Sequence, residues 1–323
     1  MKATQDPDPR IRLGVSACLL GREVRYDGEH ARDRFVVDTL GRHLTLIGVC
    51  PEDELGMGTP RETVRLVGDP AAPKMLGSHS ATDWTARMNR WSARRARELG
   101  AEDLCGYVFK KNSPSCGVFR VKVYTGKGNR SARRGRGLFV AEFSKRYPLM
   151  PIEDEERLHD PGLRENFLER IFAYRRLTDL FRGRWRRSAV VEFQSREKFL
   201  LMAHSPAGLP KLDQLIARNR DYGPAAFRDA YIIAFMEVMA LKATSAKHAK
   251  VLKCLAGYLR DHLSAAERKR VLAAIEDYRR QRAPLTVPVT LLGHYIDLHE
   301  VPGLAHQTYL NPHPRELLLR NHV

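Results

Sequence analysis

The chain has 323 residues, a length that corresponds to about two domains. Hydrophobic residues make up 43% and charged residues 29%, a balance that excludes an intrinsically disordered chain. No run approaches the ~20 apolar residues of a membrane span, and the first residues form no apolar signal core, so we expect a cytoplasmic protein. A formal charge of +17, from 55 Lys and Arg against 38 Asp and Glu, favours a polyanionic partner, nucleic acid before membrane.

Residues 1–150 are predicted to form an α/β domain with a mainly parallel sheet, because strand and helix patterns alternate along them. Strand-like apolar runs occupy 11–17, 43–49, 104–109 and 118–124, and helical patterns occupy 35–40 and 83–99. Residues 126–137 are expected to form an exposed Gly/Arg loop, and 138–143 to form another strand.

An all-α domain is predicted for the second half of the chain. Helical periods cover 161–182, 190–203, 208–219, 224–241, 244–262, 264–281 and 285–299. We divide this half into a basic helical connector, 151–187, and an all-α domain, 188–323. Residues 309–314 are expected to be an irregular docking loop.

Three of the five cysteines lie just beyond predicted strands. Cys18 and Cys50 follow two of them directly, and Cys116 lies in the loop after a third. The carboxyl ends of parallel strands meet at one edge of a sheet, so these thiols can converge. They could then bind a structural zinc with a fourth ligand, bind a 4Fe–4S cluster with one iron left open, or stay unligated. Cys105, at a strand start, and Cys254, in an apolar helical pattern, are expected to be packing residues.

Polar residues crowd the loops that carry these three cysteines. Glu52 is placed for proton transfer, although it could instead be a carboxylate at a helix N-terminus. Ser113 could orient a substrate or simply form the turn before Pro114. Which of Glu52, Asp53 and Glu54 faces the site stays open.

Several motifs in the first half resemble the thiouracil desulfidase family over about residues 11–150. They are CLLGREVRYDG (18–28), VCPEDELGMGTPRE (49–62), SPSCG (113–117) and VKVY (121–124). The second half is similar to the YbgA-like helical domain, through EFQSREKFLLMAHSP, KHAKVLKCLAGYL, PLTVPVTLLGHY and YLNPHPREL. The joined architecture is similar to that of the bacterial tRNA 4-thiouridine desulfidases.

This resemblance implies an enzyme that hydrolyses a C–S bond without redox chemistry, converting 4-thiouridine in tRNA to uridine and hydrosulfide. It implies a 4Fe–4S cluster bound by Cys18, Cys50 and Cys116 with one open iron site, and catalytic roles for Glu52 and Ser113. Further substrate-binding candidates in the same loops are Arg25, Asp27, Arg61, Lys110, Lys111, Asn112 and Ser115. The alternatives are a desulfidase of free thiouracil or thiolated nucleotides, and a non-catalytic RNA-binding protein with a structural zinc.

The basic residues concentrate in 170–187, which holds seven arginines and one acid among eighteen residues, and in the loop 127–136. Arginines of this kind bind phosphates in a salt-dependent way, so we expect tRNA as the partner, with no membrane and no obligate protein partner. The interleaved aromatic residues are expected to face the core. The RNA-binding candidates are Arg133, Arg134, Arg136, Arg175, Arg176, Arg184, Arg186 and Arg187.

Overall fold

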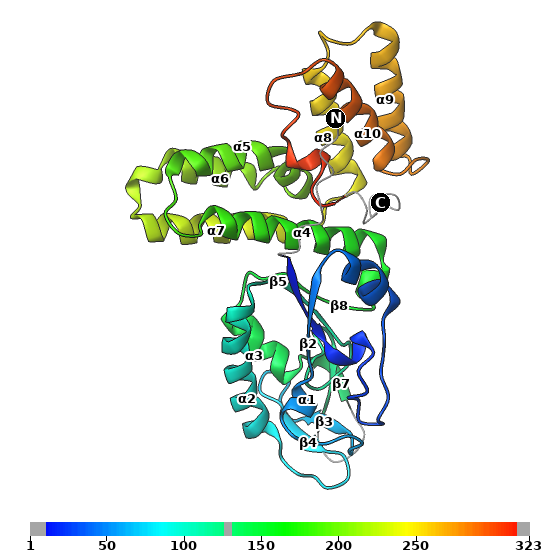
Figure 1. The fold of residues 1–323 in the computed structure, drawn as a ribbon, viewed down its shortest axis with the longest axis vertical. Helices are drawn as coiled ribbons and strands as arrows, with labels where there is room; N and C mark the ends of the chain where they lie inside the picture. The colour runs from blue at the N-terminus through cyan, green and yellow to red at the C-terminus, as the bar shows by residue number, and fades with distance from the viewer. Residues whose placement is uncertain (1–10, 126–130, 315–323) are drawn as a thin grey trace. The chain divides into compact units, whose positions relative to one another are not determined.

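The structure, a computed structural model, describes residues 11–125 and 131–314 of the chain. It separates into two units, Met1–His159 and Asp160–Val323, both drawn in Figure 1. No helix in the described ranges is long and apolar enough to cross a membrane.

A four-stranded parallel sheet forms the centre of the first unit. Its strands lie in the order β2 (Thr45–Val49), β1 (Arg12–Ser16), β5 (Leu104–Phe109) and β8 (Ile152–Asp154). All neighbouring pairs are parallel, and β5 is buried over its whole length, as expected for a strand covered on both faces. The predicted α/β fold with a mainly parallel sheet is therefore confirmed.

A second sheet in the same unit has the order β4 (Lys74–Gly77), β3 (Val64–Val67), β6 (Val121–Tyr124) and β7 (Ser131–Gly135). β3 and β6 are parallel, and the other two pairs are antiparallel. The expectation of a loop over 126–137 is wrong for 131–135, because this basic segment pairs with β6 as an edge strand. Charged edge strands discourage pairing with other chains. Residues 126–130 lie outside the described residues.

The expected strand at 138–143 is instead part of a helix, α3 (Leu138–Arg146). Its apolar run was too short for periodicity to separate a strand from a buried helix. In the helix, Phe139 and Phe143 lie four residues apart and make edge contacts with Tyr107 and Phe109 of β5. Figure 1 shows α3 beside α2 (Thr85–Glu98), and the two helices pack together.

Short helical segments complete the first unit. They are α1 (Pro51–Glu54) and the turns Ala17–Leu20, Phe35–Thr39, Leu40–Arg42, Leu99–Glu102 and Arg157–His159. The first unit ends at His159, after β8 and one further helical turn, which is nine residues beyond the expected boundary at 150.

The second unit is helical, as predicted. Its helices are α4 (Pro161–Leu180), α5 (Arg187–His204), α6 (Leu209–Ala217), α7 (Pro224–Ala240), α8 (Ser245–Tyr258), α9 (Ala265–Arg279) and α10 (Thr286–Leu298), with turns at Asn219–Asp221 and Thr308–Leu310. Asp160 and Thr244 cap the N-termini of α4 and α8, and Ser264 with Glu267 forms a capping box on α9. Because α4 packs on α7, part of the expected connector 151–187 belongs to this helical unit.

The segment 309–314 packs into the second unit, so the expectation of a docking loop is wrong. Tyr309 is fully buried, and its hydroxyl lies 3.0 Å from Nδ1 of His248. His313 is also buried, with Nε2 at 2.9 Å from Oε1 of Glu165 on α4. These contacts hold the segment against α8 and α4.

Gly14 tests how tightly the central sheet is packed. A Cβ at this position would lie 2.2 Å from Cδ2 of Tyr107, a fully buried ring stacked on Phe109 at 3.8 Å. We expect Gly14→Ala to lower the free energy of unfolding of the first unit by about 1–3 kcal/mol, because the ring must move in a close-packed core. Gly257→Ala on α8 is the control and should not destabilise the protein, because beyond the chain neighbours and the backbone of the helix the added Cβ meets no atom within 4 Å. Urea unfolding measures both, and equal midpoints for Gly14→Ala and the parent would contradict this packing argument.

Candidate functional site

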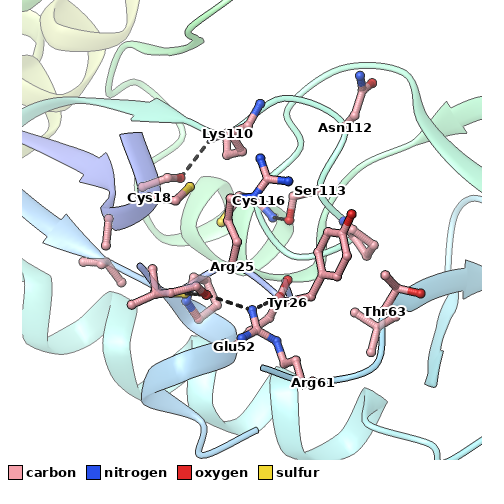
Figure 2. Close-up of a pocket in the computed structure, with 18 of the residues that line it drawn as sticks. Cys18, Arg25, Tyr26, Glu52, Arg61, Thr63, Lys110, Asn112, Ser113 and Cys116 are labelled. Atoms are coloured by element: carbon pink, nitrogen blue, oxygen red, sulfur yellow. Dashed lines mark hydrogen bonds and ion pairs between the residues drawn. The ribbon is translucent and has the colours of Figure 1, made fainter. Parts of the chain in front are cut away.

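A pocket of about 260 Å³ lies at the carboxyl ends of β1, β2 and β5. All the residues that line it belong to the first unit. They are Ser16, Ala17, Cys18, Val24, Arg25, Tyr26, Val49, Cys50, Pro51, Glu52, Arg61, Thr63, Val64, Lys110, Lys111, Asn112, Ser113, Pro114 and Cys116, most of which are drawn in Figure 2.

The structure brings the three cysteines that follow strands to this pocket. Cys18 lies in the helical turn after β1, Cys50 is the N-cap of α1 after β2, and Cys116 lies in the loop after β5. Cys18 and Cys116 are buried, and Cys50 is partly exposed. Ser16 and Val49 are paired in the parallel register, so the chain segments that continue to Cys18 and Cys50 leave the sheet at the same edge.

Burial makes all three thiols hard to ionise. The pKa of Cys18 and that of Cys50 are each raised to about 11, mainly by burial, and at Cys18 the proximity of Cys50 contributes to this rise. The pKa of Cys116 lies well above its usual value because of burial, although a hydrogen bond with Ser16 partly offsets this. A bound cation would lower these pKa values and favour the thiolates.

The other two cysteines lie elsewhere. Cys105 is buried at the start of β5, where its thiol donates to the carbonyl oxygen of Asp103 at 3.9 Å. Cys254 is exposed, so the expectation that it packs in a core is wrong. Its neighbours Val251, Leu252 and Leu255 form the buried face of α8, which leaves Cys254 on the opposite side.

Glu52 is the acid of the CPEDE segment that lines the pocket. Its Oε1 accepts a hydrogen bond from the hydroxyl of Ser115 at 2.8 Å, and its Oε2 accepts one from Arg61 at 2.5 Å. Asp53 is exposed to solvent. Glu54 instead accepts from the backbone N–H of Cys50 at 3.2 Å and pairs with Arg95 of α2 at 3.0 Å.

The two serines of the SPSCG segment differ in position. Ser113 lines the pocket, and its Oγ accepts hydrogen bonds from the backbone N–H groups of Ser115 and Cys116, both at 3.1 Å. The turn role considered from the sequence is thus realised, and the hydroxyl hydrogen of Ser113 is left to donate. Ser115 is fully buried and is not among the residues that line the pocket, but its hydroxyl donates to Glu52.

Arg61 connects the loops around the pocket. Its side chain is only 6% exposed, and besides Glu52 it donates to the carbonyl oxygens of Val24 at 3.1 Å and Gly58 at 2.8 Å. Such a buried arginine holds the carboxylate and both loops in place.

The remaining candidate substrate-binding residues lie at or near the pocket and are paired with acids or exposed. Arg25 forms a two-bond ion pair with Asp27, at 3.2 and 2.7 Å. Lys110 and Lys111 pair with Glu155 and Glu156. Asn112 is exposed at the pocket with a left-handed backbone, φ 59°. Sequence reasoning missed Ser16, Tyr26 and Thr63, although Ser16 and Tyr26 lie within two and eight residues of Cys18.

The RNA-binding candidates divide into structural and exposed arginines. Arg175 pairs with Asp179 at 2.8 Å, and Arg176 forms two bonds with Glu197, at 2.7 and 3.0 Å. Arg187 bonds to Asn219 and donates to the carbonyl oxygen of Tyr222 at 3.0 Å. The exposed ones are Arg134, Arg136, Arg184 and Arg186, and the side chain of Arg133 lies outside what the structure describes. As expected, Phe172 and Phe181 of this basic segment are buried.

Comparison with known proteins agrees with this division into two parts. The 2-thiouracil desulfurase family model matches residues 13–155, and a family of unknown function, DUF1722, matches residues 198–314. The uncharacterised protein YbgA of Escherichia coli (strain K12) is 30% identical over 162 residues, which are 49% of this chain and 94% of YbgA.

The uncharacterised protein YbbK of Bacillus subtilis (strain 168) is 31% identical over 129 residues, covering 35% of this chain and 83% of YbbK. Among solved structures, the 4Fe–4S-dependent thiouracil desulfidase TudS is 28% identical, with a TM-score of 0.38 and coverage of 46% of this chain and 94% of TudS. The chain therefore belongs to the 2-thiouracil desulfurase family through its first half, which is joined to a YbgA-like DUF1722 domain.

Proposed function

We propose that this protein is a desulfidase that removes sulfur from 4-thiouridine in tRNA, with a 4Fe–4S cluster bound by Cys18, Cys50 and Cys116. The observation that carries the proposal is the meeting of three thiols, two of them buried and one partly exposed, with the Glu52 carboxylate in one pocket. Membership of the 2-thiouracil desulfurase family supports cleavage of a C–S bond.

The residues of the pocket fit such a cluster. In the described residues, no group of three His, Cys, Asp or Glu side chains is arranged to hold a single metal ion. A 4Fe–4S cluster instead places each thiolate on a different iron, so its ligands surround a wider volume. Three cysteines leave one iron of such a cluster without a protein ligand, whereas a structural zinc would need a fourth protein ligand. When bound, the cluster would supply a soft Lewis acid for the sulfur of the substrate.

In this proposal, the Glu52 carboxylate accepts a proton from the attacking water. Hydrolysis replaces sulfur by the oxygen of water at the ring carbon, and gives uridine, hydrosulfide and one proton. Each oxygen of Glu52 already accepts one hydrogen bond, from Ser115 or Arg61, and keeps a lone pair for the proton of the attacking water. These two partners also hold the carboxylate in one orientation.

Ser113 has a complementary role in this proposal. Its oxygen already accepts from two backbone N–H groups, so the hydroxyl can only donate. A donated hydrogen bond would stabilise the charge that develops on the base or on the departing sulfur.

The charge of the chain supports a large RNA substrate. A net charge of +17 is not needed to bind a free base. Arg184 and Arg186 are exposed in the segment between α4 and α5, where phosphates can reach them. The matched family is named for 2-thiouracil, so desulfurisation of a free thio-base or thio-nucleotide is the second candidate.

The cysteine assignment is tested by iron content. Replacing Cys18, Cys50 or Cys116 by Ala should abolish stable iron binding and turnover, because each loss leaves two thiolates for the cluster. Cys105→Ala and Cys254→Ala are the controls and should keep both. Iron and visible absorbance are measured on anaerobically purified protein, and full iron content in any of the first three variants would remove that cysteine from the ligand set.

The role of Glu52 is tested by an isosteric change. Glu52→Gln should keep the iron of the parent protein but lower kcat by about 100-fold or more, because the amide cannot take the proton from water. Asp53→Asn, an exposed neighbour in the same helical turn, should leave kcat unchanged. Single-turnover release of hydrosulfide measures the effect, and parent-like turnover of Glu52→Gln would exclude Glu52 as the proton acceptor.

The choice of substrate is tested by comparing thiolated tRNA with 4-thiouridine monophosphate. We expect a higher kcat/KM for the tRNA, and a tRNA affinity that falls at least about tenfold between about 50 and 200 mM salt. Replacing Arg184 and Arg186 together by Ala should weaken tRNA binding and flatten this salt dependence. Arg279→Ala, an exposed arginine paired with Glu276, serves as the control. Turnover of the free nucleotide alone would identify the second candidate as the function.

A further inference from the structure

Tyr26 is an exposed aromatic side chain in the wall of the pocket. It is 44% exposed, whereas two of the three cysteines in the same pocket are buried. Of the large hydrophobic side chains exposed in the described ranges, Tyr26 is the one that lines the pocket. Figure 2 shows its ring among the pocket side chains, in view between Ser113 and Thr63. The proposed reaction gives this ring no chemical task.

Neighbouring groups hold Tyr26 in place. The guanidinium of Arg25 lies over the ring at 5.7 Å from its centroid, and the two bonds to Asp27 fix that guanidinium. The carbonyl oxygen of Tyr26 accepts a hydrogen bond from the backbone N–H of Arg61 at 2.8 Å. Gly28, with φ 81°, closes the turn by donating to the carbonyl oxygen of Arg25 at 3.0 Å. A ring held in this way loses little conformational entropy when a ligand packs on it.

Polar groups that suit the edge of a base line the same pocket. The amide of Asn112 offers both a donor and an acceptor, and the hydroxyl of Ser113 offers a donor. The edge of a uracil ring carries carbonyl acceptors and one N–H donor, so these groups complement it. The lysines of the pocket, in contrast, are paired with Glu155 and Glu156.

We infer that Tyr26 is the stacking platform on which the pyrimidine ring of the substrate lies, so that the ring itself, more than its sugar or phosphate, is recognised in this pocket. This inference rests on the proposed function for the class of ligand. Stacking of a base on an aromatic side chain needs only its π face. A sulfur-free pyrimidine nucleotide therefore binds through the same contact.

The experiment measures binding of uridine 5′-monophosphate to the anaerobically prepared full chain by equilibrium dialysis, with and without added iron and sulfide. Tyr26→Ala should bind this nucleotide about tenfold more weakly than the parent, whereas Tyr26→Phe, which keeps the ring, should bind within about twofold. Ribose 5-phosphate, which has no base, should bind equally to all three proteins. Tyr258→Ala, which removes a tyrosine that is 51% exposed in the second unit, is the matched control and should bind like the parent.

Three results would overturn the inference. They are parent-like nucleotide binding by Tyr26→Ala, equal losses in Tyr26→Ala and Tyr26→Phe, and an equal weakening of ribose 5-phosphate binding. Because the nucleotide contains no sulfur, its binding does not depend on C–S cleavage. Loss of binding in Tyr26→Ala together with an inactive parent would thus reject the proposed function and keep the platform. An active parent with unchanged binding in Tyr26→Ala would reject the platform alone.

Discussion

The parallel pairing of β1, β2 and β5 is the constraint on which the site depends. It carries the chain out of the sheet at one edge, where Cys18 and Cys50 follow the strands. Cys116 lies in the same pocket because the chain turns tightly around it. Gly117 packs against the backbone of Ser113 and Gly137 against that of Ser115, and neither position has space for a Cβ. Bringing three thiols into a buried pocket is unfavourable for their ionised forms, and a bound cationic cluster would offset that cost.

The part of the site that follows from local sequence was predictable, and the part that depends on distant contacts was not. A cysteine directly after an apolar β-rich run can be assigned to a strand end without knowing the fold. The choice between Glu52 and Glu54 could not be made in this way, since both lie in one helical turn. It depends on Ser115 for the first acid and on Arg95 for the second, residues far along the chain.

Secondary structure follows the same rule. The long helices of the second unit show several turns of periodicity and were predictable. The three residues of β8 include two acids, and β7 is rich in arginine, so neither looks like a strand until a neighbour pairs with it. α3 was mistaken for a strand because its apolar run is short, and only the packing of Phe139 and Phe143 on β5 distinguishes the two.

Many basic side chains of the second unit pair with acids of the same unit and so stabilise its fold, in addition to any part they play in binding a partner. His313 and His204 form hydrogen bonds with Glu165 and Glu169 of α4. Nδ1 of His204 lies 2.7 Å from the carbonyl oxygen of Leu241, which can only accept, so Nδ1 carries the hydrogen. Arg175 and Arg176 are likewise paired with acids, which leaves a smaller set of exposed arginines to bind phosphates.

The account as a whole is tested most directly by native mass spectrometry of the anaerobically purified chain. It predicts a mass increase of about four iron and four sulfide per chain, and loss of that increase on exposure to oxygen. A stoichiometric zinc ion, or an unchanged mass after anaerobic addition of iron and sulfide, would contradict it.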